Sequence, residues 1–145
     1  MAEKLTIEVV TPERAVLSGE AEEVILPGSQ GQMGILPGHL PLLSALGIGQ
    51  MVVKGLSGGG ERKFFVDGGF VEVLPNKVTV MTEACDGFDE IDAAQARSAI
   101  EIAEKELLEI EERSKAEEVE EDVMARHHDA LKRARVRLMM SQGEE

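Results

Sequence analysis

The segment Val78–Ala96, VTVMTEACDGFDEIDAAQA, contains the point at which the chain changes character. Before Asp86-Gly87 the sequence is rich in Gly, Pro and Val, whereas after it there is no Pro and only Gly143 interrupts the run. Pro and Gly break regular structure, so their absence permits long helices. The segment therefore predicts an α+β fold, with a β-rich domain at residues 1–88 and a helical domain at residues 89–145.

Short apolar runs alternate with turn residues in the N-terminal part. Leu5, Ile7 and Val9 recur with the period of two that is typical of a strand. Many short strands at close spacing favour a small antiparallel β-sandwich or flattened barrel. The other runs and their turn signals are Val24–Leu26 before Pro27-Gly28, Met51–Val53 before a hairpin loop at Gly58–Gly60, Phe64–Val66 before a hairpin-type turn at Asp67–Gly69, and Val78–Met81 after a turn at Pro75-Asn76.

The C-terminal part has the pattern of two amphipathic helices. We expect Asp89 to cap the first helix, with Asp92 in its first turn. Highly charged residues at 114–122 are the expected connection, so the helices should form an antiparallel hairpin. Both apolar stripes are narrow, so the hairpin should need a partner surface. The first stripe is Ile100, Ala103, Leu107 and Ile110, and the second is Val123, Met124, Leu131, Ala134 and Leu138.

Charge divides the helical part into two unlike segments. The whole chain carries a formal net charge of -13, which argues against nucleic acid or an anionic membrane surface as a partner. Residues 89–122 hold 14 acidic and 4 basic residues, whereas residues 123–142 hold 5 basic and 1 acidic residue. The basic segment either pairs with the acidic helix or docks elsewhere, which makes it a candidate switch, or it is an ordinary solvated face. Its cations are Arg126, Lys132, Arg133, Arg135 and Arg137.

The sequence offers no catalytic constellation. It contains no P-loop, no Gly-x-Ser-x-Gly elbow and no His-Glu-x-x-His pattern. The only cysteine, Cys85, fits a buried structural thiol, and the adjacent His127 and His128 point about 100° apart on a helix, which does not suit one metal ion. We therefore expect no enzyme activity, no metal and no cofactor. No signal peptide and no membrane-spanning run is recognisable, which predicts an intracellular protein.

One loop stands out in the N-terminal part. The tetrapeptide Ile-Leu-Pro-Gly occurs at residues 25–28 and again at residues 35–38, and Pro-Gly suits the central positions of a type II turn. Between the two copies lies the polar, glycine-rich segment 29–34, and His39-Leu40-Pro41 follows the second copy. Such a segment is either a shaped surface loop that binds a partner or a simple connection between strands.

The run GSQGQMGILPGHLPLLSALGIG, residues 28–49, resembles the signature of the ε subunit of F-type ATP synthases, called δ in mitochondria. Further matches lie at Phe65–Val73, at Asn76–Met81 and at the helix start Ile91–Ala96. The resemblance extends over essentially the whole chain, in the family's order. The loop signature is specific because Gly, Pro and His recur at fixed offsets, whereas Ala/Glu/Lys helices are common.

The resemblance implies a ten-stranded N-terminal β-sandwich, a C-terminal two-helix hairpin and a non-catalytic role in the central stalk. The β domain would bind the γ subunit and the c-ring, rotate with γ and couple proton flow to ATP synthesis. In a bacterium the subunit would be peripheral, on the cytoplasmic face of the inner membrane. The implied contact residues are Ser29, Gln30, Gly31, Gln32, Met33, Gly34, His39 and Pro41.

The resemblance also implies regulation by the helical hairpin. In bacterial members the last helix extends into the α/β catalytic head and blocks ATP hydrolysis, a role that would fall to the cations of residues 126–137. Some members bind ATP on the hairpin, but Gln95 stands here where the pattern expects Arg, so at most a weak site is expected at Ile91, Asp92, Ala96 and Arg126. The alternative function is a non-catalytic interaction module of another complex, with a β-sandwich anchor and a helical docking arm.

Overall fold

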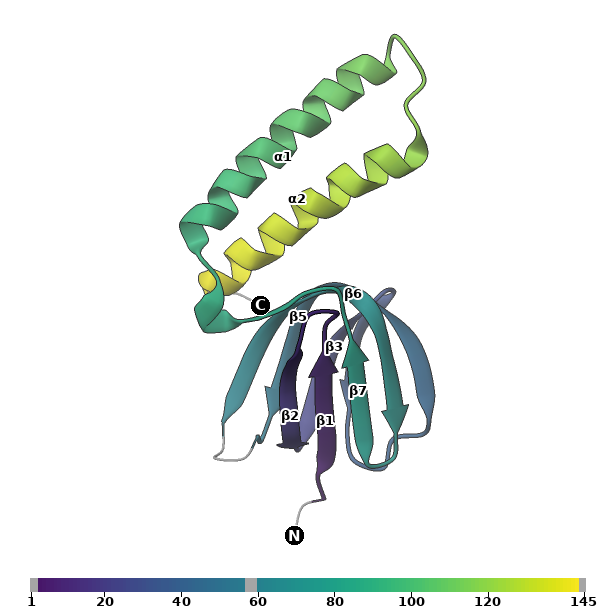
Figure 1. The fold of residues 1–145 in the computed structure, drawn as a ribbon, viewed down its shortest axis with the longest axis vertical. Coiled ribbons are helices and arrows are strands. Elements are labelled where there is room, and N and C mark those ends of the chain that lie inside the picture. The colour runs from purple at the N-terminus through teal and green to yellow at the C-terminus, as the bar shows by residue number, and fades with distance from the viewer. Residues whose placement is uncertain (1–2, 57–59, 144–145) are drawn as a thin grey trace. The chain divides into compact units, whose positions relative to one another are not determined.

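The computed structural model describes residues 3–56 and 60–143, and these residues form eight strands, two α-helices and one 3-10 turn. The chain divides into two compact units, Met1–Glu90 and Ile91–Glu145 (Figure 1). The first unit holds all eight strands, and the second holds both helices. This arrangement confirms the α+β class predicted from the change of pattern at Asp86-Gly87.

The strands form one continuous sheet path that folds around a core. The path runs β2-β1-β7-β6-β5-β3-β4, and β8 pairs with β6 beside it. All the pairings are antiparallel except that of β1 with β7, which is parallel, so the expectation of a wholly antiparallel sandwich was wrong at this pair. The strands are β1 (Leu5–Val10), β2 (Ala15–Ala21), β3 (Glu23–Gly28), β4 (Gly31–Ile35), β5 (Leu42–Lys54), β6 (Glu61–Leu74), β7 (Lys77–Met81) and β8 (Cys85–Gly87).

The two longest strands, β5 and β6, each contribute to both layers of the β domain. The first half of β5 pairs with the second half of β6, as in Leu42↔Val73, and the later halves pair as in Lys54↔Glu61. β7 borders the second half of β6, whereas β8 borders the first half. The described residues hold eight strands, two fewer than the ten that the resemblance implied, because β5 and β6 are long and continuous.

Gly68 and Gly69 bend β6 without ending it. Both have positive φ, of 65° and 99°, and a Cβ at Gly69 would lie 1.9 Å from the carbonyl oxygen of Met81 on β7. Strand pairing continues on both sides, because Asp67 pairs with Ile48 and Gly69 with Leu46. The predicted hairpin turn at Asp67–Gly69 was therefore wrong. Glycine here permits a sharp bend of the strand and a close approach of two backbones. A Gly-Gly pair occurs in such bends as well as in turns, so the sequence does not distinguish the two.

The two Ile-Leu-Pro-Gly copies have different structures. Pro27 and Gly28 lie inside β3, and Gly28 pairs with Gly31 across the tip of the β3–β4 hairpin, so a turn at the first copy was wrongly predicted. At the second copy, Gly38 has φ of 88° and the N–H of His39 donates to the carbonyl of Leu36 at 3.2 Å. That geometry fits the predicted type II turn.

The core of the β domain lies between its two layers. It is built from the inward positions of alternating strands, with Phe64 as its largest side chain. The β5–β6 hairpin loop predicted at Gly58–Gly60 connects Lys54 to Glu61, but Gly58 and Gly59 lie outside the described residues. The buried members are Leu5, Ile7, Val9, Ala21, Val24, Leu26, Ile35, Leu46, Met51, Val53, Leu56, Phe64, Val66, Val71, Val73, Val78, Val80 and Cys85.

The helical domain consists of α1 (Ala93–Ser114) and α2 (Glu121–Ser141), which fold back on each other as the predicted hairpin (Figure 1). Asp92, not Asp89, caps α1, because its carboxylate accepts the N–H of Gln95 at 3.1 Å. Asp89 lies in the 3-10 turn Phe88–Glu90 that precedes the helix, so the predicted cap was three residues early. A short 3-10 turn before a helix leaves no separate signal in the sequence.

The interface between the helices has a small apolar cluster. Ala103 and Leu107 on α1 pack with Leu131 on α2, and half-buried Ile100 joins them. This cluster confirms the narrow stripes expected from the sequence. Within the described residues, neither helix is long and apolar enough to cross a lipid bilayer.

Candidate functional site

The tip of the β3–β4 hairpin is the most exposed part of the predicted contact loop. Ser29, Gln30, Gly31, Gln32 and Gly34 are exposed, and the segment is a strand hairpin, not an irregular loop. The N–H of Ser29 donates to the carbonyl of Ala45 at 3.2 Å, which fixes the tip beside β5. Half-buried Met33 packs against the core. The tip therefore presents amide and hydroxyl groups on a rigid support.

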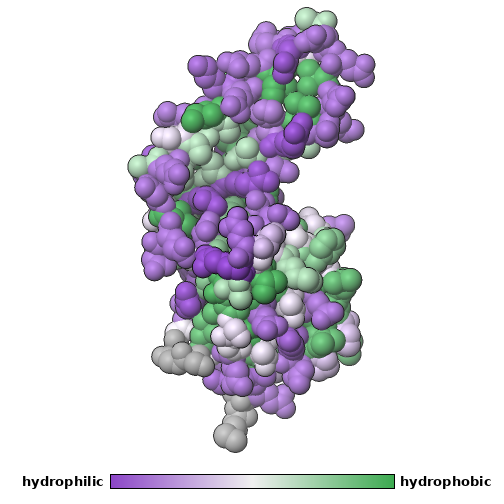
Figure 2. All heavy atoms as spheres, in the orientation of Figure 1, coloured by the Kyte–Doolittle hydropathy of each residue, from purple (hydrophilic) through white to green (hydrophobic). Residues whose placement is uncertain are grey.

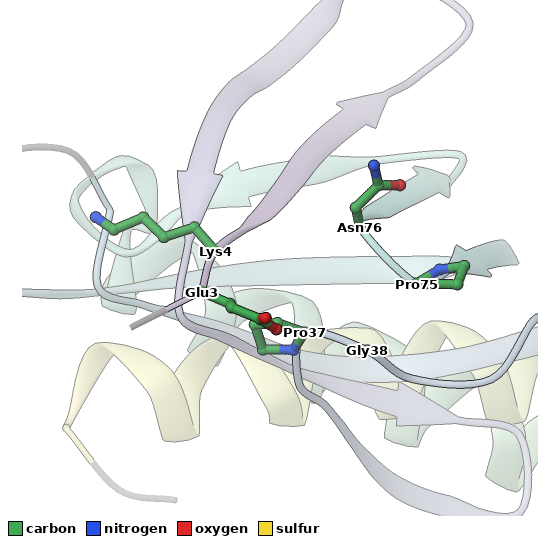
Figure 3. Close-up of a pocket in the computed structure, with 6 residues that line it drawn as sticks. All are labelled: Glu3, Lys4, Pro37, Gly38, Pro75 and Asn76. Atoms are coloured by element: carbon green, nitrogen blue, oxygen red, sulfur yellow. The ribbon is translucent and has the colours of Figure 1, made fainter. Parts of the chain in front are cut away.

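His39 and Pro41 lie between the turn at Pro37-Gly38 and the start of β5 at Leu42. The neighbouring turn at Pro37-Gly38 is joined to the β6–β7 turn, because the N–H of Gly38 donates to the carbonyl of Pro75 at 2.7 Å. Figure 3 shows these two turns lining one shallow pocket together with Glu3, Lys4 and Asn76.

The register of β3 with β5 places the tip near the start of β5. β3 runs antiparallel to β5, with Gly28 beside Leu46, so the tip that follows Gly28 continues towards Leu42. Ser29 is bonded to Ala45, which lies four residues after Pro41, and four residues of strand span about 13 Å.

A set of exposed apolar side chains lies on the outward side of β5, β6 and β7. We call Leu43, Phe70, Leu74 and Met81 the apolar face; Leu43 is 68% exposed and Phe70 is 54% exposed. Phe70 and Leu74 alternate with the inward Val71 and Val73, and Phe70 pairs with Met81 across the strands. Figure 2 shows apolar side chains gathered on the part of the β domain where β6 and β7 lie.

The apolar face was missed in the sequence interpretation, although the sequence carried a signal for it. In β6 both the inward and the outward residues are apolar, as in Phe70-Val71 and Val73-Leu74. The inward residues of such a strand fill the core, and the outward residues need another apolar surface to cover them. An exposed apolar cluster of this kind marks an interaction surface.

The cations of α2 are distributed over two sides of the helix. Arg126, Lys132 and Arg135 are exposed, whereas Arg133 and Arg137 are half-buried. Arg126, Arg133 and Arg137 follow the helical spacing of seven and four residues, so they share one side beside the apolar stripe. Lys132 and Arg135 project from other angles. The basic segment therefore already presents three exposed cations in the closed hairpin.

The structure does not bring the candidate nucleotide residues together. Asp92 is engaged as a helix cap and Ala96 is buried at the start of α1. Arg126 lies next to His127, which meets Glu106 on α1, and Glu106 is ten residues beyond Ala96. Ten residues correspond to about 15 Å along a helix. In this closed hairpin Arg126 is therefore too far away to complete a site with Ile91, Asp92 and Ala96.

Cys85 is buried as predicted, at 3% exposure in the core of the β domain. Burial, with a smaller contribution from the nearby Asp86 carboxylate, raises the pKa of its thiol from 9.0 to about 11. A thiol held in its neutral form is a poor nucleophile. In the described part of the chain, no three His, Cys, Asp or Glu side chains gather in a way that suits a metal ion.

Comparison with known proteins identifies the family. A family model described as the ATP synthase delta/epsilon chain β-sandwich domain matches residues 4–86, which is the β domain with its hairpin tip and apolar face. The chain belongs to the ATP synthase epsilon chain family. It is accordingly a non-catalytic subunit of the central stalk of an F-type ATP synthase, and this confirms the resemblance drawn from the loop signature.

Several epsilon chains are similar to this chain over most of its length. The epsilon chain of Syntrophobacter fumaroxidans is 38% identical over 142 residues, covering 98% of each chain. The epsilon chain of Nitratidesulfovibrio vulgaris strain DP4 is 43% identical over 113 residues, covering 78% of this chain and 83% of that one. The similarity in the first case includes the helical domain, which the family model does not cover.

Two solved structures share the fold. A chain of the Euglena gracilis mitochondrial ATP synthase, from an OSCP/F1/c-ring assembly, aligns with a TM-score of 0.72 and 22% identity over 91% of this chain and 78% of that chain. A chain of the Tetrahymena thermophila enzyme, from a central stalk/c-ring assembly, gives a TM-score of 0.60 and 15% identity over 96% and 97% of the two chains. Both share the fold of this chain over more than nine-tenths of its length.

Proposed function

We propose that this epsilon chain links the γ subunit to the c-ring through its β domain and restrains ATP hydrolysis through its helical domain. The observation that carries the proposal is the apolar face, because a β domain with a complete core has no internal use for four further exposed apolar side chains. Through these contacts the subunit takes part in coupling proton flow to ATP synthesis. In a bacterium it would lie at the cytoplasmic face of the inner membrane, held there by the complex.

The γ subunit is the proposed occupant of the apolar face. Glu72 lies among these residues, between Phe70 and Leu74 on β6 and opposite Leu43. The Glu8–Lys77 ion pair, whose side-chain atoms lie 3.1 Å apart, lies beside them on β1 and β7. Apolar side chains mixed with a few charged ones are the usual composition of a protein interface. Phe70 is flanked by Ala45 on β5 and Met81 on β7 and is therefore the expected hot spot.

The c-ring is the proposed partner of the hairpin tip. The exposed tip residues Gln30 and Gln32 carry no charge, so contact there would rely on amide hydrogen bonds and would depend little on salt concentration. The turn that holds His39 and Pro41 leads into the start of β5, the strand to which the tip is bonded through Ser29 and Ala45, so these residues are assigned to the same contact.

The catalytic head is the proposed partner of α2 in its extended state. Arg126, Lys132 and Arg135 are already exposed, and extension of the helix would free the half-buried Arg133 and Arg137 as well. Five cations within twelve residues would then face the α/β subunits. Acidic surfaces on those subunits would attract them.

The docking part of the proposal can be tested by adding the full chain to a complex depleted of its own epsilon subunit. Phe70→Ser should weaken binding to γ by about tenfold or more, because it removes a central apolar side chain. Leu108→Ser is the matched control, since Leu108 is 64% exposed and lies on α1, outside the β domain. Equal binding of the two variants would contradict the assignment of this face to γ.

The regulatory part is tested by ATP hydrolysis in the same reconstituted complex. The double variant Lys132→Glu with Arg135→Glu should bind normally and relieve inhibition severalfold. The matched control, Arg97→Glu with Lys105→Glu, makes the same charge change at exposed positions of α1. If the Lys132→Glu, Arg135→Glu variant still inhibits ATP hydrolysis fully, the proposed role of these cations in inhibition is wrong, whereas the proposed role of the β domain in the stalk is unaffected. Failure of the unmodified chain to bind γ would favour an interaction module of another complex.

A further inference from the structure

His127 joins the two helices of the hairpin through a contact whose chemistry depends on its proton. Its Nε2 lies 3.7 Å from the Glu106 carboxylate on α1, and its Nδ1 lies 2.8 Å from the carbonyl oxygen of Val123 on its own helix. The His127 side chain is only 29% exposed, whereas that of Glu106 is 52% exposed. The imidazole is therefore held between a fixed backbone acceptor and a carboxylate of the other helix.

The backbone contact decides which nitrogen carries the proton in the neutral ring. A carbonyl oxygen only accepts hydrogen bonds, so Nδ1 must be the protonated nitrogen that donates to Val123. In the neutral ring Nε2 then has a lone pair and no hydrogen, and it faces a carboxylate that is itself only an acceptor. Two acceptors cannot form a hydrogen bond. Uptake of a proton at Nε2 gives the ring a positive charge and turns this 3.7 Å contact into an ion pair across the helices.

Charged groups of both signs lie near the contact. On α1, Lys105 precedes Glu106, and Glu109 follows it by three residues. Arg113 lies a further turn away and pairs with Glu117 at 3.9 Å. On α2, Arg126 and His128 flank His127, and the positions four residues on either side of it are the apolar Val123 and Leu131. Glu106 is the carboxylate that meets the ring across the helices.

The hairpin is small enough for this contact to matter. The described apolar cluster between the helices consists of Ala103, Leu107, Leu131 and Ile100, and Leu131 lies one turn from His127. We propose that His127 and Glu106 form an acid-closed latch, which holds α1 and α2 together when the imidazole carries a proton and weakens when it loses it. Mild acid would thus favour the closed hairpin.

The latch is a property of the isolated chain, and only its consequence for ATP hydrolysis rests on the proposed function. The test is amide hydrogen exchange of the full chain at about pH 5.5 and about pH 7.5, corrected for the intrinsic effect of pH on exchange. Amides of α1 and α2 should be about two- to fivefold better protected at the lower pH, the range expected for a partly exposed ion pair. Amides of the β core serve as an internal reference.

Two variants and one control make the result specific. Glu106→Gln should abolish the pH effect, because its neutral amide can donate to the unprotonated Nε2 and gains little from the protonated ring. His127→Gln should abolish it as well, whereas His128→Gln should retain it, since His128 is exposed on another side of α2. A pH effect that persists in Glu106→Gln, or that is absent from the unmodified chain, would overturn the latch.

Hydrolysis measurements separate the latch from the proposed function. In the reconstituted complex, inhibition by the unmodified chain should be weaker at the lower pH than inhibition by Glu106→Gln. A pH effect on exchange without this difference would support the latch and count against regulation by the helices. Absence of the exchange effect, with inhibition still sensitive to the α2 cations, would overturn the latch and leave the proposed function standing.

Discussion

The backbone N–H of Gly38 donates a 2.7 Å hydrogen bond to the carbonyl of Pro75 and so joins two turns from distant parts of the sequence. Asn76, the next residue, accepts the N–H of Thr6 at 2.9 Å, which connects the first strand to the same place. Three chain segments thus meet at this end of the β domain (Figure 3). The position of His39 and Pro41 depends on that junction.

Gly38→Ala should destabilise this end of the domain modestly. Gly38 has φ of 88°, but a Cβ there would meet no atom within 4 Å, so the cost is conformational only, about 1–2 kcal/mol. Gly38→Asn should cost less, because Asn tolerates positive φ better than Ala. Urea unfolding of the two variants measures the difference; an Ala variant as stable as the Asn variant would contradict the assigned strain.

Gly69→Ala should be far more damaging. Its Cβ would lie 1.9 Å from the carbonyl oxygen of Met81, so β6 and β7 would have to separate in addition to the strain of positive φ. We expect a loss of about 3 kcal/mol or more. Gly60→Ala is the control, since Gly60 has a similar φ of 87° and open space around it. Urea unfolding of both variants measures the difference. An equal loss of unfolding free energy in Gly69→Ala and Gly60→Ala would show that the close approach of Gly69 to Met81 is unimportant.

Asp92→Ala should shorten α1 at its first turn. The Asp92 carboxylate caps the N–H of Gln95, and loss of a cap of this type costs about 1 kcal/mol. Asp89→Ala should have little effect, because Asp89 precedes the helix. Hydrogen exchange of the Gln95 amide reports the change directly. Faster exchange in the Asp89 variant than in the Asp92 variant would restore Asp89 as the cap.

Cys85 should make the β domain less stable at alkaline pH. Its pKa is raised to about 11 in the folded chain against an ordinary 9.0, so its contribution is fully present below pH 9. As the pH rises from 9 to 11 the unfolded chain loses the proton first, and the folded state loses up to about 1.4 kcal/mol per pH unit. Urea unfolding between pH 8 and 10.5 should show a steeper decline for the natural chain than for Cys85→Ala.

The order of elements could be predicted from the sequence, but several of their ends could not. Period-two alternation identified β1, and helical spacing identified the stripes of α1 and α2. The Pro-Gly and Gly-Gly signals were ambiguous, because the same residues serve a turn at Gly38, a strand at Gly28 and a bend at Gly69. Which of these occurs depends on whether a neighbouring strand continues the pairing, and that is a tertiary property.

The proposed contact residues were singled out from the repeated tetrapeptide, and their role stays a prediction. That residues 29–34 form the tip of the β3–β4 hairpin was visible only in the structure. The apolar face was missed because Phe70, Val71, Val73 and Leu74 were taken together as one apolar strand, without separating its inward side from its outward side. The His127–Glu106 contact joins residues that are far apart in sequence, and only the packing of the helices brings them together.

The continuity of β5 and β6 through both layers has a mechanical consequence. Two sheets that touched only through side chains would be free to slide over each other under a lateral load. Here, sliding would have to break the backbone hydrogen bonds that run along both long strands, from Leu42↔Val73 to Lys54↔Glu61. Force applied at one end of the β domain is thus carried to the other end by covalent bonds and paired backbone. In a rotor this makes the domain a stiff transmitter of torque.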